Sequence, residues 1–211
     1  MLFRSILSSD IPTRSGFTFV EWNTAEDGSG ASYAPGAAYT REEAVTLYAQ
    51  WQRITYLVTY NPGAGSGGPT VQVKEAGVPL KLSEDKPTRN GFTFVCWNTS
   101  AAGTGTSYEP GELYFDDANL NLFAIWKRLT YTVYYNANGG TGAPVSQTKE
   151  WGVALTLSSE TPQRNGYSFQ NWNTRADGSG TNYAPGASYT DRKSTRLNSS
   201  HIGSSRMPSS A

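Results

Sequence analysis

The same nine-residue segment occurs three times along the chain, at a constant spacing of 75 positions. Residues 16–24 read Gly-Phe-Thr-Phe-Val-Glu-Trp-Asn-Thr, and close variants return at residues 91–99 and 166–174. A Tyr-x-Pro-Gly segment keeps the same spacing, and so do several other positions. Because no insertion disturbs this register, we infer a tandem duplication. The chain must then fold as a series of like units, each of which buries its own small core.

The register divides the chain into one complete repeat and two partial ones. Residues 54–128 form the complete repeat. Residues 1–53 lack the counterpart of its first strands, and residues 129–190 are expected to lack its last strand. A unit of 75 residues can bury only a limited core, on the order of 60% of its unfolded surface.

The remaining residues, 191–211, do not continue the repeat. The closing Leu-Phe-Ala-Ile-Trp of residues 122–126 is replaced by Leu-Asn-Ser-Ser-His at residues 197–201. Residues 192–201 also resemble translated sequencing-adapter read-through, which is excluded from fold reasoning. We therefore expect 191–211 to be a non-native or disordered tail; a natural Ser-rich flexible tail is the alternative.

Composition excludes several classes of protein. The chain has 6 Trp and 13 Tyr but only 1 His and 1 Cys, too few for an internal disulfide, a zinc finger or a His-dependent hydrolase. A formal net charge of zero without a basic block disfavours nucleic acid as a partner. No stretch approaches the ~20 apolar residues that span a bilayer, so we expect no membrane insertion in this segment.

Each repeat has the pattern of short strands joined by turns. β-Branched and aromatic residues predict strands at residues 55–60, 92–98 and 120–126, with a returning strand near 70–74. In the last predicted strand, Leu120, Leu122, Ala124 and Trp126 share the face that we assign to the core. Ala34-Pro35-Gly36 and its counterparts indicate type II turns. No segment has a sustained helical period.

These motifs together resemble the Listeria–Bacteroides repeat, the family of the internalin B B-repeat. The resemblance rests on Tyr-x-Val-x-Tyr-Asn, Gly-Phe-Thr-Phe-x-x-Trp-Asn-Thr, Tyr-Ala-Pro-Gly and a closing Leu-Tyr-Ala-Gln-Trp, in order at fixed spacing over about residues 5–190. It implies a mainly β fold of tandem small β-grasp-like repeat units of 75 residues. It also implies an extracellular location at the bacterial cell surface or envelope, and it implies no catalytic residue and no cofactor.

The function expected from this resemblance is a non-catalytic spacer and adhesion module of a surface or secreted protein. Two alternatives stay open. The repeats could bind a host surface protein or glycan directly, or they could be accessory repeats of a secreted glycan-degrading enzyme. We expect a monomer. The five aromatic residues that could contact a ligand are Tyr48, Phe123, Tyr33, Tyr108 and Tyr183, although core packing is the simpler interpretation for them.

Other polar motifs have simple structural interpretations. Asp27-Gly28-Ser29-Gly30 offers one carboxylate where calcium needs six to eight oxygens, so we interpret it as a turn. Asp116-Asp117 could pair as acid and base, but a solvated turn is the better interpretation. Cys96 is expected to be a surface thiol because the siblings at its position are polar, and Asn98 matches a glycosylation pattern without an expected role. His201 lies in the expected tail, and no role is assigned to it.

Overall fold

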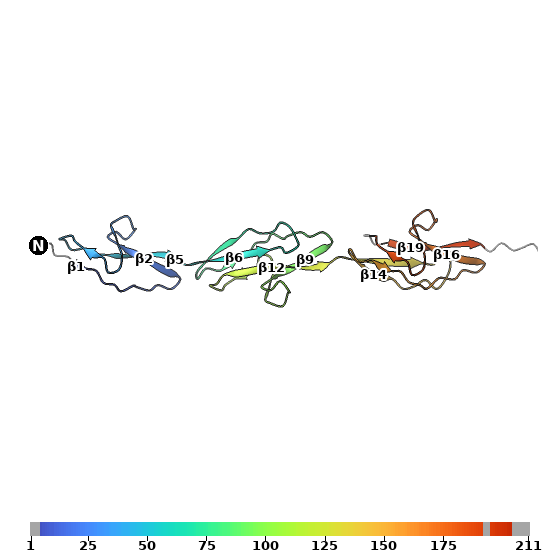
Figure 1. Cartoon of the computed structure of the whole chain (residues 1–211), viewed down its shortest axis with the longest axis horizontal. Helices are drawn as coiled ribbons and strands as arrows, with labels where there is room; N and C mark the ends of the chain where they lie inside the picture. Colours follow the sequence, from blue (N-terminus) through green and yellow to red (C-terminus); the bar gives the residue numbers. More distant parts are fainter. Residues whose placement is uncertain (1–4, 192–194, 204–211) are drawn as a thin grey trace, which may run out of the picture. The chain divides into compact units, whose positions relative to one another are not determined.

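The computed structural model describes residues 5–191 and 195–203. Backbone contacts divide the chain into two compact units, Met1–Thr88 with Val95–Ile125, and Arg89–Phe94 with Trp126–Ala211. All regular elements of the described residues are β-strands (Figure 1). The expectation of a mainly β fold built from tandem repeats is therefore confirmed.

The third repeat, in the second unit, contains a five-stranded mixed sheet. The strand order is β14-β13-β19-β16-β17, in which β13 and β19 run parallel and the other neighbours are antiparallel. A separate two-stranded sheet pairs β15 with β18. The strands are β13 (Thr130–Asn136), β14 (Gln147–Glu150), β15 (Leu155–Thr156), β16 (Tyr167–Asn173), β17 (Asn182–Tyr183), β18 (Ser188–Tyr189) and β19 (Thr195–Gly203).

The core of this repeat lies between the large sheet and the small one. Val133, Leu157, Trp172, Tyr189 and Leu197 are almost completely buried and form one cluster. Large aromatic rings supply much of the buried area, which lets so small a unit fold without a disulfide.

The middle repeat has the same arrangement at a spacing of 75 positions. Its large sheet has the order β10-β9-β12-β6-β7, and β8 pairs with β11. The corresponding positions Val58, Leu82, Trp97, Tyr114 and Leu122 are buried again. The strands are β6 (Thr55–Asn61), β7 (Gln72–Glu75), β8 (Leu80–Lys81), β9 (Phe92–Asn98), β10 (Ser107–Tyr108), β11 (Leu113–Tyr114) and β12 (Leu120–Arg128).

The predicted core face of the closing strand is confirmed in β12. Leu120, Leu122 and Ala124 are buried, and Trp126 is half-buried. The predicted strand at residues 92–98 coincides with β9. Period-2 alternation was sufficient here because β12 is regular and only one of its faces meets the core.

The first repeat, in the first unit, has a smaller sheet with the order β3-β2-β5, and β1 pairs with β4. Its Trp22 is half-buried and lines a cavity of about 170 Å³ with Leu7, Ser8 and Leu47. The strands are β1 (Ser5–Ile6), β2 (Phe17–Asn23), β3 (Ser32–Tyr33), β4 (Ala38–Tyr39) and β5 (Tyr48–Arg53).

The Pro-Gly segments form the turns that their sequence predicts. The Ala37 amide donates to the Ala34 carbonyl at 3.1 Å, and Gly36 has φ of 72°. Proline before a positive-φ glycine, closed by this hydrogen bond, is the type II geometry. The turn places β3 and β4 so that Tyr33 can contact Tyr39, which lies at the core.

The expectation that the third repeat lacks its last strand is wrong for residues 195–203. These residues form β19, which pairs in parallel with β13 and antiparallel with β16, and Leu197 is fully buried. Pairing uses backbone groups, which need a partner whatever the side chains are. Leu197 keeps the identity of Leu122, and the small Ser199 is buried where Ala124 lies in the middle repeat. The rest of the expected tail, 192–194 and 204–211, lies outside the described residues.

A β-bulge breaks the alternation of the central strand. The register of β2 against β5 shifts between Phe19 and Glu21, and that of β16 against β19 shifts between Phe169 and Asn171. A bulge places two residues opposite one, so that face assignment by period 2 fails beyond it. Cys96, which was expected at the surface because the residues at its position in the other repeats are polar, is buried, whereas Glu21 and Asn171 are half-buried.

Candidate functional site

The Trp-Asn-Thr segment that recurs in each repeat organises the loop that follows it. Asn23 is fully buried at the end of β2, and its Oδ1 accepts hydrogen bonds from the amides of Ala25 and Gly30, both at 2.9 Å. Its Nδ2 donates to the carbonyls of Gly28 and Gly30. One amide side chain thus satisfies both ends of a loop that has no regular structure of its own. Asn98 and Asn173 make corresponding bonds in the other repeats.

Threonine and glycine complete this loop. The amide of Thr106 donates to Thr99 Oγ1 at 2.9 Å, and the amides of Ala31 and Thr181 make the same contact in their repeats. A Cβ on Gly105 would lie 2.2 Å from that Oγ1, so the position requires glycine. The same clash exists at Gly30 and Gly180. The buried Asn98, which matches a glycosylation pattern in the sequence, uses both its side-chain oxygen and its nitrogen in the hydrogen bonds of this loop.

The Asp-Gly-Ser-Gly segment is a turn. Asp27 Oδ1 accepts from the Ser29 amide at 3.0 Å and from the Ser29 hydroxyl, and Asp177 does the same with Ser179. These hydrogen bonds lower the pKa of both carboxyl groups. Within the described residues no group of three or more His, Cys, Asp or Glu side chains could hold a metal ion.

Three of the five aromatic candidates take part in packing. Tyr33, Tyr108 and Tyr183 are half-buried, and each ring lies against the buried tyrosine of the adjacent short strand. The centroid distances are 5.7 Å to Tyr39, 6.1 Å to Tyr114 and 5.3 Å to Tyr189. Tyrosine before the Pro-Gly turn therefore joins the two small strands at the core.

Tyr48 and Phe123 occupy corresponding positions on the closing strands of the first and middle repeats. Tyr48 is 38% exposed and, with Arg14, Glu26, Gln50 and Trp51 among others, lines a surface pocket of about 470 Å³. Phe123 is half-buried, opposite Asn61 on β6. The structure therefore does not bring the five candidates together into one site. The structure also shows that Arg14 and Glu26, which are distant from Tyr48 in the sequence, line the same pocket as Tyr48.

The sequence did not predict an ion pair between a buried lysine and a partly exposed aspartate. Lys74 on β7 is fully buried, and its Nζ donates to Asp117 Oδ1 at 2.5 Å. Asp117 also accepts from the Gly77 amide, and the lysine and this amide hold the pKa of Asp117 below its usual value. Asp117 lies exposed in a bend, as expected for a solvated turn, but it also takes part in this ion pair, which was not expected. Alternation along residues 70–74 predicts the hydrophobic Val71 and Val73 inside and Lys74 outside, but the two valines are exposed and Lys74 is buried, so this pattern gave no signal for the pair.

His201 also has a structural place, although none was expected. Its Nε2 lies 2.7 Å from Ser199 Oγ and 3.4 Å from the Ala137 carbonyl. Its ring lies 5.9 Å from the Phe169 ring, at the position that Trp126 occupies against Phe94 in the middle repeat. An aromatic ring of smaller size thus replaces tryptophan at the end of the closing strand.

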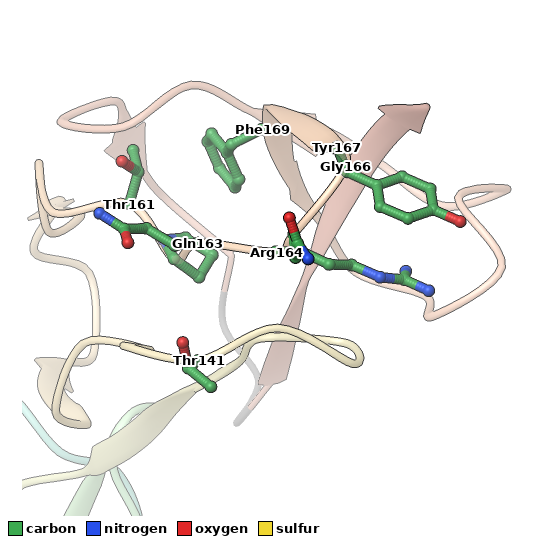
Figure 2. A pocket seen from close by; sticks show the side chains of 9 residues that line it. Thr141, Thr161, Gln163, Arg164, Gly166, Tyr167 and Phe169 are labelled. Atoms are coloured by element: carbon green, nitrogen blue, oxygen red, sulfur yellow. The ribbon is translucent and has the colours of Figure 1, made fainter. Parts of the chain in front are cut away.

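A surface pocket of the second unit lies beside the segment that leads into β16. It has a volume of about 650 Å³, and its lining includes Arg164, Tyr167 and Phe169 with Thr141. Figure 2 shows Arg164 extending alongside the Tyr167 ring at one end, while Thr141 lies on a separate loop. The Arg164 guanidinium is 4.1 Å from the ring centroid of Tyr167, which is 44% exposed. No function was expected for these residues.

The model of the Listeria–Bacteroides repeat domain matches the chain three times, at residues 4–50, 56–125 and 131–198. The third match extends into β19, in agreement with the pairing of that strand. The matched residues make up most of the chain, so the resemblance inferred from the motifs is confirmed.

The chain spans between 18% and 26% of the length of the relatives described here. A protein of Evansella cellulosilytica named as a Gly-rich membrane protein is 34% identical over 163 residues, which are 75% of this chain and 18% of that protein. A second membrane protein of the same bacterium is 28% identical over 84% of this chain and 26% of its own length. Internalin H of Listeria monocytogenes is 28% identical over 54% of this chain and 20% of its own. Among the described residues, no helix has the length and apolarity to cross a membrane.

Proposed function

Since the chain belongs to the Listeria–Bacteroides repeat family, we propose that it is a non-catalytic repeat region of a bacterial cell-surface protein and acts as a spacer. One observation carries the proposal. The polar residues that recur in the repeats serve the repeats themselves, because the buried asparagines hold the loops and Arg53 and Arg128 join neighbouring repeats. The names of the relatives, two membrane proteins and an internalin, support a place in the cell envelope.

A fold proposal accompanies this function. We propose that each repeat is a β-grasp variant in which a loop with one short strand takes the place of the helix. The large sheet of the third repeat supports this, because its first and last long strands, β13 and β19, are parallel neighbours in the centre of the sheet. Such a unit offers a compact module for an array of repeats on the cell surface.

The location is tested on intact cells of the source bacterium with antibodies raised against this chain. We expect labelling without permeabilisation and its loss after brief protease treatment of the cells. Labelling confined to permeabilised cells would contradict the proposal. In solution we expect a monomer of 22.9 kDa, which light scattering measures directly.

A second candidate function is direct binding of a host protein or glycan, favoured by the Tyr48 pocket. The half-exposed ring beside Arg14, Glu26 and Gln50 combines stacking with hydrogen-bonding groups, as sugar and peptide sites do. A glycan and protein array probed with the whole chain tests it. Saturable binding that Tyr48→Ala abolishes, while Phe115→Ala at an exposed site outside the pocket does not, would favour this function over a pure spacer.

A further inference from the structure

The glycine that precedes the central strand has the same backbone conformation in all repeats but different surroundings. Gly16, Gly91 and Gly166 have φ of 77°, 80° and 75°. A Cβ on Gly16 would lie 3.3 Å from Ala76 Cβ, and on Gly91 it would overlap the Trp151 ring at 2.0 Å. On Gly166 it would meet no atom within 4 Å.

Ala76 and Trp151 occupy the same place in successive repeats. Each is the middle residue of a Glu-Xaa-Gly turn that joins the second strand of a repeat to its next short strand. Ala76 packs on the glycine of the first repeat, and Trp151 packs on that of the middle repeat. In both cases the turn of one repeat therefore covers the glycine of the repeat before it.

One arginine holds each of these turns. Arg53 lies 3.2 Å from Glu75 and donates to the Ala76 carbonyl at 3.1 Å. Arg128 lies 3.5 Å from Glu150 and donates to the Trp151 carbonyl at 2.8 Å.

The backbone repeats the same connection. The amide of Ile54 donates to the Gly16 carbonyl, and that of Ala76 donates to Ile54. At the second junction, Leu129 donates to Gly91 and Trp151 donates to Leu129. The two junctions thus have the same backbone hydrogen bonds, the same ion pair and the same arginine–carbonyl contact.

An aromatic ring between two arginines forms the other half of this interface. Arg14 and Arg53 lie 4.1 and 4.7 Å from the Phe17 centroid, and Arg89 and Arg128 lie 3.8 and 5.2 Å from that of Phe92. Both rings are half-buried. Cation–π contacts of this kind are stronger where water is excluded.

In the third repeat only part of this arrangement is present. Arg164 stacks on Tyr167, as Arg14 and Arg89 stack on their rings, but Tyr167 is exposed (Figure 2). The position of Arg53 and Arg128 is held by Gly203. The 650 Å³ pocket lies beside this ring.

We propose that this pocket is a socket for the Glu-Xaa-Gly turn of another Listeria–Bacteroides repeat placed in tandem after residue 203. The occupant follows from the two junctions in which the same surface is covered by such a turn. Because Gly203 supplies no guanidinium, docking here is weaker than at the other junctions, and Gly203→Arg strengthens it. The inference rests on the array of the proposed function, but its test is independent of where the protein is located.

The test extends the whole chain by replacing residues 204–211 with a second copy of residues 129–203, which keeps the register; the copied Tyr167 is changed to Phe, so that its peptide differs in mass from that of the original Tyr167. Hydroxyl-radical footprinting with mass spectrometry then measures the reactivity of Tyr167. We expect a fall of about twofold or more relative to the 211-residue chain, and a larger fall with Gly203→Arg. A control extension carries Asp in place of the copied Trp151 and Lys in place of the copied Glu150, and should leave Tyr167 reactive.

Unchanged Tyr167 reactivity in both extended proteins, with the added repeat folded by near-ultraviolet circular dichroism, would overturn the proposal. Protection of Tyr167 in the original chain by an oligosaccharide, without protection by the added repeat, would overturn it in favour of a glycan site. If an extension does not fold, Glu150→Ala in the original chain provides the second measurement. It should raise the reactivity of Phe92 and leave Tyr167 unchanged; an unchanged Phe92 would count against the socket.

Discussion

At the scale of single residues, the buried asparagine explains why the chain repeats Trp-Asn-Thr. Asn98 is buried at the end of β9 and connects residues 100, 105 and 107 through both ends of its amide. The sequence alone marked the segment as a repeated motif but did not show this role, because an asparagine on a predicted strand does not reveal which loop amides lie around it.

We predict that Asn98→Ala destabilises the middle repeat by about 1–3 kcal/mol, because it leaves buried amides and carbonyls without partners. Urea denaturation of the whole chain, followed by tryptophan fluorescence, measures the change. Asn90→Ala, at an exposed position, is the matched control and should change stability by less than about 0.5 kcal/mol. Equal effects of the two substitutions would contradict the role of Asn98.

A second prediction at this scale concerns acid. The Lys74 ammonium and the Gly77 amide lower the pKa of Asp117, and hydrogen bonds from Ser29 and Ser179 lower those of Asp27 and Asp177. A carboxyl with a lowered folded-state pKa stabilises the fold above its unfolded value, near 3.8, and this contribution is lost as the pH falls through the folded value.

We therefore expect the melting temperature to fall as the pH drops below about 4, with a smaller fall in Asp117→Asn, which has already lost part of the effect at neutral pH. Thermal unfolding followed by circular dichroism between pH 7 and pH 2 measures this. The neighbouring Asp116→Asn serves as control. An identical pH profile for the wild type and Asp117→Asn would refute the role of the ion pair.

At the scale of elements, strands were predicted correctly where the residue pattern of a segment matches the pairing of its backbone. β-Branched and aromatic runs located β6, β9 and β12, and the Pro-Gly signal located the turn after β3. The prediction failed at Cys96, which is buried although the polar residues at its position in the other repeats predicted exposure, and at β19, whose Asn, Ser and His residues do not have the hydrophobic pattern of a central strand. β19 forms nevertheless, because its backbone pairs with β13 and β16.

We predict that Leu197→Ala destabilises the third repeat by about 2–5 kcal/mol, the usual cost of truncating a fully buried leucine. Hydrogen exchange of the β13 and β16 amides measures the local loss of stability. Leu122→Ala is the counterpart in the middle repeat and should cost a similar amount there. A neutral Leu197→Ala alongside a destabilising Leu122→Ala would show that β19 does not close the third sheet.

At the scale of the whole molecule, each of the two junctions is a small interface that links consecutive repeats. The side chains of Arg128 and Glu150 are 41% and 57% exposed, so their ion pair by itself is weak and is screened by salt. The hydrogen bond to the Trp151 carbonyl and the contact with Phe92 add to it. We therefore expect Arg128 to contribute part of the coupling between the repeats, while the other contacts of the junction contribute the rest.

We predict that Arg128→Ala weakens the coupling of the middle and third repeats by about 0.5–1 kcal/mol at low salt, and by less at 1 M salt. Calorimetry should then resolve separate unfolding transitions that overlap more closely in the wild type. Lys127→Ala, one residue away and exposed, is the control. If Lys127→Ala separates the transitions equally well, the arginine has no special role.

The sequence by itself determined the repeat register, the mainly β character, the turns and the family, because these depend on local propensity and on spacing along the chain. Only the tertiary structure decided which surfaces the repeats present to one another and which polar groups are buried. The pairing of Lys74 with Asp117, the arginine-held turns and the strand at residues 195–203 join segments that are distant in sequence. Such contacts depend on how backbone partners and charges meet in space, and no local pattern records this.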